Sequence, residues 1–113
     1  MKKECKNPLC PLSQALSVIG GKWKPVIIYQ LSKSKKRFGQ LQLAVKGISR
    51  KVMTDQLKEL VEDGLVLRTE FAEIPPRVEY QLTDKGEDLL PILQSIADWG
   101  MYLVADYKKK VKL

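Results

Sequence analysis

One segment, residues 47–64, has both of its ends marked and a regular apolar period between them. Ser49 suits a helix N-cap, because its hydroxyl can accept a hydrogen bond from a backbone amide of the first turn. Gly64 suits the carboxyl end, because glycine adopts the left-handed backbone conformation without steric cost. The segment therefore predicts one amphipathic helix. The residues of its apolar face are Met53, Leu57, Leu60 and Val61.

The opposite face of this helix is polar, and its charge changes along its length. Arg50 and Gln56 lie on the flanks. The residues of the opposite face are Lys51, Thr54, Asp55, Lys58 and, near the end, Glu62. A helix that enters the major groove of DNA by its amino-terminal half needs such a face, because these side chains reach phosphates and base edges. A solvated amphipathic helix has the same pattern without any ligand. For this stretch alone both interpretations stand.

The two halves of the chain carry opposite charge. Residues 1–54 contain twelve Lys and Arg against one acidic residue, Glu4, whereas residues 55–113 contain eight Lys and Arg against twelve acidic residues. The net charge of the whole chain is +7. Solubility does not require fifty residues without an acid, and a polyanionic partner explains them. An acidic membrane surface is the competing partner, but the chain has no strongly basic amphipathic helix with a large aromatic face.

Length and composition favour a single domain. The 113 residues are 44% hydrophobic, which fits one compact unit over 1–113 with its core at about 9–107. The longest apolar runs are too short to span a membrane, and the first residues lack the apolar stretch of a signal peptide. We therefore expect a cytoplasmic protein without a membrane partner. Cys5 and Cys10 are too few for a disulfide scaffold and are expected to be reduced.

The residue types that catalysis needs are missing. The chain contains no histidine, which excludes a Ser-His-Asp or a Cys-His arrangement. The sequence also has no metal-ligand cluster and no glycine-rich phosphate loop. We therefore predict that the protein is not an enzyme and needs neither a metal nor a cofactor.

Periodicity and turn residues divide the chain into helices and one hairpin. Three helices are expected before segment 47–64, at about residues 12–19, 22–32 and 38–45. Two strands, 65–74 and 77–82, follow as a hairpin, because Pro75-Pro76 interrupts ladder pairing. A long helix from about Asp84 to Tyr107 is expected last, and it has more apolar surface than one helix of a small domain can cover.

Helices followed by a hairpin in this order are typical of a winged helix-turn-helix. The predicted fold class is therefore α+β: mainly helical, with a two-stranded β-hairpin wing and a long C-terminal helix. Arg77 on the hairpin would reach the flanking DNA backbone or the minor groove, and the basic turn Lys35-Lys36-Arg37 would contact phosphate. A solvated arginine and a solvated turn are the alternatives, and for the turn alone the solvated one is favoured. The DNA contacts predicted for segment 47–64 are Ser49, Arg50, Lys51, Thr54 and Lys58.

A sequence-indifferent nucleoid protein is the competing DNA-binding class. Such a protein is expected to spread basic residues over its whole surface and to lack a defined groove-reading face. The acidic second half of this chain favours the sequence-specific class instead.

Several short motifs are distributed over residues 9–100. They are Cys10-Pro11, Ile19-Gly20-Gly21-Lys22-Trp23, Arg37-Phe38, Gly47-Ile48-Ser49, the run from Leu57 to Val66 and the run from Pro75 to Thr83. Together they resemble the HxlR-type winged helix-turn-helix transcriptional regulators. The resemblance implies a homodimeric bacterial regulator that binds a near-palindromic double-stranded DNA operator. The sequence specifies neither the operator and its genes, nor repression or activation, nor the inducing signal or small-molecule effector.

The resemblance also implies which helices join the dimer, namely the first and the last. The apolar excess of the last helix, which is visible without the resemblance, agrees with this. The predicted interface residues are Leu12, Leu16, Trp99, Leu103 and Tyr107. For Trp99, packing against the chain's own core is the alternative.

Cys10 matches the N-terminal cysteine that senses oxidants or electrophiles in several members of the family. The local chemistry is permissive, because Lys6 is near in sequence and the amino end of a helix can lower a thiol's pKa. The alternative is an inert thiol packed beside the first helix. Cys5 is a weaker candidate or a resolving partner.

Overall fold

Helix α4 (Arg50–Glu62) forms as the sequence predicts. In a computed structural model, which describes residues 9–111, the Ser49 hydroxyl accepts a hydrogen bond from the backbone amide of Val52 at 3.1 Å. The chain leaves the helix through Gly64, whose φ of 79° lies in the left-handed region that glycine tolerates. The core-facing side chains of α4 are Met53, Leu57 and Leu60.

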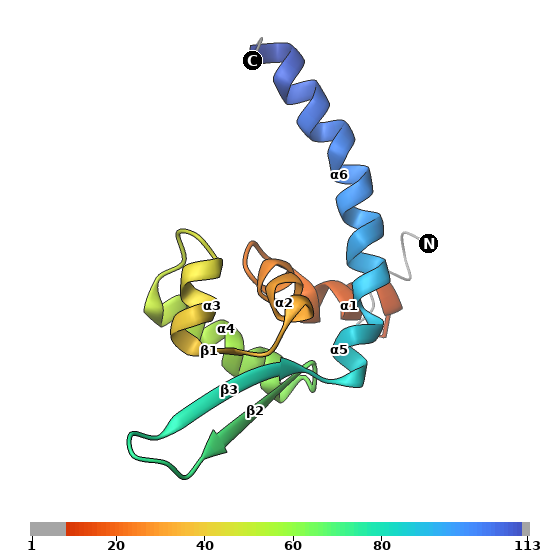
Figure 1. The fold of residues 1–113 in the computed structure, drawn as a ribbon. Coiled ribbons are helices and arrows are strands. Elements are labelled where there is room, and N and C mark those ends of the chain that lie inside the picture. The colour runs from red at the N-terminus through yellow and green to blue at the C-terminus, as the bar shows by residue number, and fades with distance from the viewer. Residues whose placement is uncertain (1–8, 112–113) are drawn as a thin grey trace.

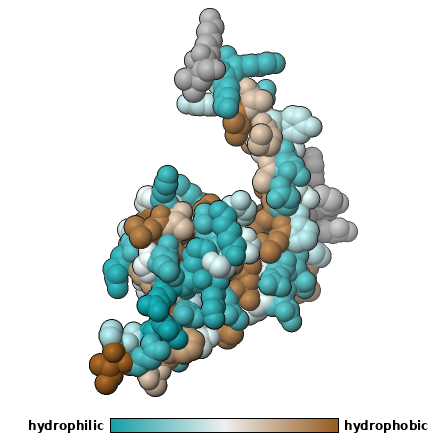
Figure 2. Space-filling model, in the orientation of Figure 1, coloured by the Kyte–Doolittle hydropathy of each residue, from teal (hydrophilic) through white to brown (hydrophobic). Residues whose placement is uncertain are grey.

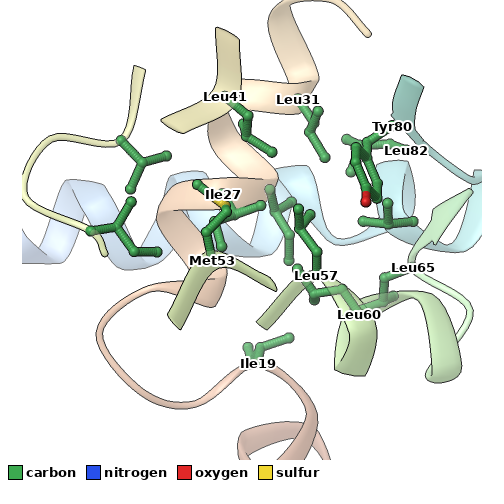
Figure 3. Close-up of a cluster of buried hydrophobic side chains, with 14 residues drawn as sticks. Ile19, Ile27, Leu31, Leu41, Met53, Leu57, Leu60, Leu65, Tyr80 and Leu82 are labelled. Atoms are coloured by element: carbon green, nitrogen blue, oxygen red, sulfur yellow. The ribbon is translucent and has the colours of Figure 1, made fainter. Parts of the chain in front are cut away.

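Three helices precede α4 and surround its apolar face. They are α1 (Pro11–Ile19), α2 (Lys24–Lys33) and α3 (Phe38–Ala44). Helix α2 begins two residues later than expected and occupies the centre of the fold, between α3 and α4 on one side and α1 and α6 on the other (Figure 1). The core that these helices enclose with the sheet is apolar (Figure 3), and its labelled members are Ile19, Ile27, Leu31, Leu41, Met53, Leu57, Leu60, Leu65, Tyr80 and Leu82.

The predicted hairpin is present, but the sheet has a third strand. The strands are β1 (Lys36–Arg37), β2 (Val66–Phe71) and β3 (Arg77–Leu82), and their order in the sheet is β1-β3-β2. Both pairings are antiparallel. The expectation of a basic turn at residues 35–37 was therefore wrong for Lys36 and Arg37, which pair with Tyr80 and Glu79. A two-residue strand shows no alternation, so its sequence alone does not reveal it.

The predicted final helix is divided in two. Helix α5 (Asp84–Asp88) and helix α6 (Leu90–Val111) are separated by one residue, Leu89. Pro91 explains the break, because it has no amide hydrogen to donate to the carbonyl of Glu87 and its ring clashes with that carbonyl. The chain tightens there instead, and the amide of Leu89 donates to the carbonyl of Gly86 at 3.2 Å.

Helix α6 packs against the body only with its first turns and then extends away from it (Figure 1). Leu90 and Leu93 contact the core. Farther along, large apolar side chains lie at the surface. In the described part of the chain, no helix combines the length and the apolar character that a membrane span requires.

Gly86 allows α5 to approach the start of β2 closely. A Cβ atom on Gly86 would lie 2.3 Å from the carbonyl oxygen of Leu65, which is backbone and cannot rotate away. We therefore expect Gly86→Ala to lower the free energy of unfolding by ~1–3 kcal/mol, the usual cost of overpacking, as measured by urea denaturation.

Gly39→Ala is the matched control, because Gly39 is also helical but has no atom within 4 Å of an added Cβ. Its substitution should leave stability unchanged or raise it by up to ~1 kcal/mol through the lower entropy of the unfolded chain. Equal effects of the two substitutions would contradict the close approach of α5.

Candidate nucleic-acid interface

Helices α3 and α4 form a helix-turn-helix pair whose second member presents the predicted contact face. The turn between them contains Gly47, with a φ of 86°, and the buried Ile48, which anchors it to the core. Because Met53, Leu57 and Leu60 fix one face of α4 inward, the opposite face points to solvent. The predicted contact residues that the structure leaves exposed on or beside α4 are Ser49, Arg50, Lys51, Thr54 and Lys58.

The amino end of α4 is suited to an anion. The Ser49 side chain satisfies one amide of the first turn, and no acidic side chain lies in that turn. The remaining amides and the helix dipole leave partial positive charge at this end, which favours a DNA phosphate.

Arg50 and Thr54 are held in place by neighbours. The Arg50 guanidinium lies over the ring of Phe38, 4.9 Å from its centroid, so α3 supports a side chain of α4. The Thr54 hydroxyl donates to the carbonyl oxygen of Arg50 at 2.9 Å. Its oxygen can still accept a hydrogen bond, for example from the amino group of a base.

Lys51 is paired with a carboxylate that sequence reasoning did not assign to the site. Lys51 Nζ lies 3.0 Å from Asp55 Oδ2, one helical turn away, and both side chains are exposed. Asp55 therefore orients Lys51 and places an acceptor on the face, and a carboxylate can accept from the amino group of cytosine. Its position four residues after Lys51 was the signal for this pair.

A groove of about 450 Å³ lies between α4 and the strands of the hairpin. Lys58 lines it from α4, and Arg68 lines it from β2 with 44% of its side chain exposed. Glu62 also lines the groove, and Arg68 lies 3.7 Å from Glu70. Sequence reasoning missed Arg68, because only the fold places that strand beside the exposed face of α4.

The three cations of the expected basic turn have different roles. Lys36 Nζ donates to the carbonyl of Gln30 at 2.8 Å, which ties β1 to α2. Lys35 Nζ lies 3.5 Å from Glu79 Oε1. Arg37 is exposed, and its backbone amide, not its guanidinium, donates to Gln40 Oε1 at the start of α3. Of the three, Arg37 is the best placed for a phosphate.

Arg77 lies at the first residue of β3, behind the tip of the wing, and its charge is already balanced. The guanidinium stacks on Phe71, 4.1 Å from the ring centroid. It lies 3.4 Å from both Glu73 Oε1 and Glu79 Oε2, and 27% of the side chain is exposed. A phosphate contact by Arg77 stays a prediction, and it requires DNA to compete with two carboxylates. The tip itself presents Ile74, which is fully exposed.

The predicted interface residues on α1 and α6 are all exposed. The exposed fractions are 49% for Leu12, 53% for Leu16, 62% for Trp99, 54% for Leu103 and 60% for Tyr107. Apolar surface recurs along α6 in Figure 2. Trp99 does not pack against the chain's own core, which was the alternative for this residue.

Cys10 is the N-cap residue of α1, and its side chain is buried with 4% exposure. Its carbonyl oxygen accepts the amide of Gln14 at 3.0 Å. Cys5, the second cysteine considered for redox chemistry, lies outside the described residues. Within the described part of the chain, no group of His, Cys, Asp and Glu is arranged to hold a metal ion.

The model of the HxlR-like helix-turn-helix family matches residues 18–108. The chain belongs to this family. The chain is also similar to an HTH-type transcriptional regulator of Halalkalibacterium halodurans, BH0655, with 50% identity over 92 residues, or 80% of this chain and 81% of that protein. The chain is accordingly a transcriptional regulator of the helix-turn-helix type.

Solved structures of similar proteins have the same fold. A protein from Porphyromonas gingivalis W83, named as a MarR-family transcriptional regulator, has a TM-score of 0.79 and 42% identity, covering 84% of this chain and 93% of its own. The redox regulator HypR in its oxidized form has a TM-score of 0.77 and 41% identity, covering 82% of this chain and 96% of its own. The α+β winged-helix prediction is thus confirmed.

Proposed function

We propose that this regulator binds a near-palindromic DNA operator as a homodimer, with α4 of each protomer in the major groove of one half-site. The observation that carries the proposal is the exposed face of α4, which has a capped, acid-free amino end followed by Arg50, Lys51, Thr54 and Lys58. Phosphate contacts from the helix end and from Arg37 would set the register. The side chains of α4 would select the bases.

The exposed apolar surfaces of α1 and α6 support the homodimer. Leaving Trp99, Leu103 and Tyr107 in water is unfavourable, because each buries much apolar area when a partner covers it. A second copy of the same chain brings the same surfaces and joins them by a two-fold axis. Two-fold symmetry then places the two copies of α4 about one DNA turn (~10 bp) apart or a multiple of it.

A sequence-indifferent DNA-binding role is the alternative from another class. It is disfavoured by the neighbours of two exposed side chains of α4, since Arg50 stacks on the ring of Phe38 and Lys51 pairs with Asp55. Purely electrostatic binding needs mobile cations and gains nothing from a carboxylate on the contact face.

The DNA contacts predict the effect of truncating Arg50 and Lys51. Arg50→Ala or Lys51→Ala should each weaken binding to an operator selected from random DNA by ~1–3 kcal/mol if the side chain holds a base, with relaxed specificity at that position. Gel shifts with excess random competitor DNA measure this. Lys109→Ala, which removes an equal charge from the far end of α6, is the control and should have little effect. Operator binding that survives both substitutions together would show that α4 does not read the site.

If α6 forms the homodimer interface, a charged side chain introduced on α6 should dissociate the dimer. Wild-type protein should have about twice the 12.9 kDa mass of one chain in light scattering at micromolar concentration. Leu103→Asp should shift the mass toward one chain, because the charge would be buried in the interface. Leu43→Asp is the matched control, since Leu43 is 83% exposed on α3, and it should leave the mass unchanged. A monomeric wild type, with and without DNA, would exclude the homodimer.

We further infer that Cys10 makes operator binding responsive to thiol-reactive compounds. The position of Cys10 supports this, because Cys10 is the N-cap residue of α1, one of the two helices proposed to form the dimer. HypR, at 41% identity, is named a redox regulator. With a quinone, the Cys10 thiolate adds its sulfur to a ring carbon, and the ring takes up a proton from water to become a hydroquinone thioether. The bulky adduct no longer fits the buried site, so it would displace α1.

Operator binding before and after a quinone tests this role. Wild type and the control Cys5→Ser should both change in operator affinity, whereas Cys10→Ser should not. The response should be faster at higher pH, because the thiolate reacts and the thiol does not. If wild type and Cys10→Ser respond alike, or if neither responds, Cys10 is structural.

A further inference from the structure

Lys24, at the start of α2, is a buried charge with a specific partner on the proposed reading helix. Lys24 is 6% exposed and is the charged residue that stands out as buried in the described part of the chain. Its Nζ donates to Glu59 Oε1 of α4 at 3.0 Å, across 35 residues of sequence. The other carboxylate oxygen of Glu59 lies 3.5 Å from Gln56 Nε2, so the carboxylate is held from its own helix as well.

Stability alone does not explain this pair. Burying an ammonium group carries a desolvation penalty, and apolar residues of similar volume often replace a buried ion pair without loss. A methionine at position 24 would suit the apolar surroundings of α2. Glu59 has half of its side chain in solvent, so water can solvate its carboxylate in the absence of Lys24.

The Lys24–Glu59 pair is a directional contact between α2 and α4, unlike the apolar contacts of the core. Met53, Leu57 and Leu60 attach α4 to the core by non-directional apolar packing. Such contacts resist separation more strongly than a small rotation of the helix about its own axis. A hydrogen bond depends on the donor–acceptor distance and angle, so the Lys24–Glu59 pair opposes that rotation.

Helix α2 also contacts the long helix, so it links the two functional elements. Residues next to Lys24 on α2, among them Pro25, Val26 and Tyr29, line a hollow of about 350 Å³ together with Leu93 and Ile96 of α6. Figure 1 shows α2 between α4 and α6. The orientation of α4 relative to the proposed dimer helix is therefore set through α2.

We propose that Lys24 and Glu59 are positioning residues for DNA recognition: their hydrogen bond fixes the rotation of α4 so that its exposed side chains meet the bases. This inference rests on the proposed operator binding by α4. Non-specific binding depends on charge near the phosphates and tolerates a rotated helix. Losing the pair should therefore affect binding to the operator but not to random DNA.

The test compares Lys24→Met and the double variant Lys24→Met/Glu59→Gln with the wild type and with Lys109→Met. Lys109→Met makes the same chemical change at an exposed position of α6. The measurements are the Kd for a selected operator, the Kd for random DNA, and the thermal unfolding midpoint. Lys24→Met leaves no buried unpaired charge, because Glu59 stays half exposed, so this variant is expected to fold.

We expect Lys24→Met to weaken operator binding about tenfold, as when a base contact is misaligned, with random-DNA binding and the unfolding midpoint nearly unchanged. The double variant should show the same operator loss, because both residues act through one bond. Unchanged operator binding, or parallel losses of operator binding, random-DNA binding and stability, would overturn the positioning role alone. A wild type that prefers no sequence over random DNA would overturn the operator proposal and this inference with it.

Discussion

The burial of one face of α4 is the constraint on which the rest of the structure depends. Met53, Leu57 and Leu60 lie within a core that α2, α3 and the sheet enclose. Removing one of these buried side chains would leave a cavity as well as lose transfer free energy. Because the apolar face of α4 packs inward, the cationic face on the opposite side of the helix points to solvent. Folding of the core therefore also exposes the contact face.

Whether a cationic side chain at the surface is available to DNA depends on the charges of its neighbours. Arg50, Thr54 and Lys58 keep hydrogen-bonding capacity outward, whereas Arg77 is balanced by Glu73 and Glu79. On α4, Asp55 pairs with Lys51, but no acidic side chain lies in the first turn of the helix. The amino end of α4 is therefore a favourable place for a polyanion.

Local signals made much of the fold predictable, and long-range packing accounts for the rest. The cap at Ser49, the stop at Gly64 and the apolar period between them gave α4 nearly to the residue. Strand β1 was missed, because two residues have no period and pair with a distant strand. Pro91 indicates the break before α6, but the continuous apolar pattern on both sides of it favoured one long helix. No sequence pattern indicates the burial of Lys24, since lysine is a surface residue type and its partner is 35 residues away.

Selection of bound sequences from a random DNA library measures whether two copies of α4 read two half-sites. A dimer that reads DNA in this way should enrich a site with two inverted half-sites whose centres lie ~10 bp apart or a multiple of it. The protein carrying both Arg50→Ala and Lys51→Ala should lose that enrichment while still retaining DNA at low salt. Enrichment of a single unrepeated half-site would contradict the dimer, and enrichment of no sequence would contradict specific reading by α4.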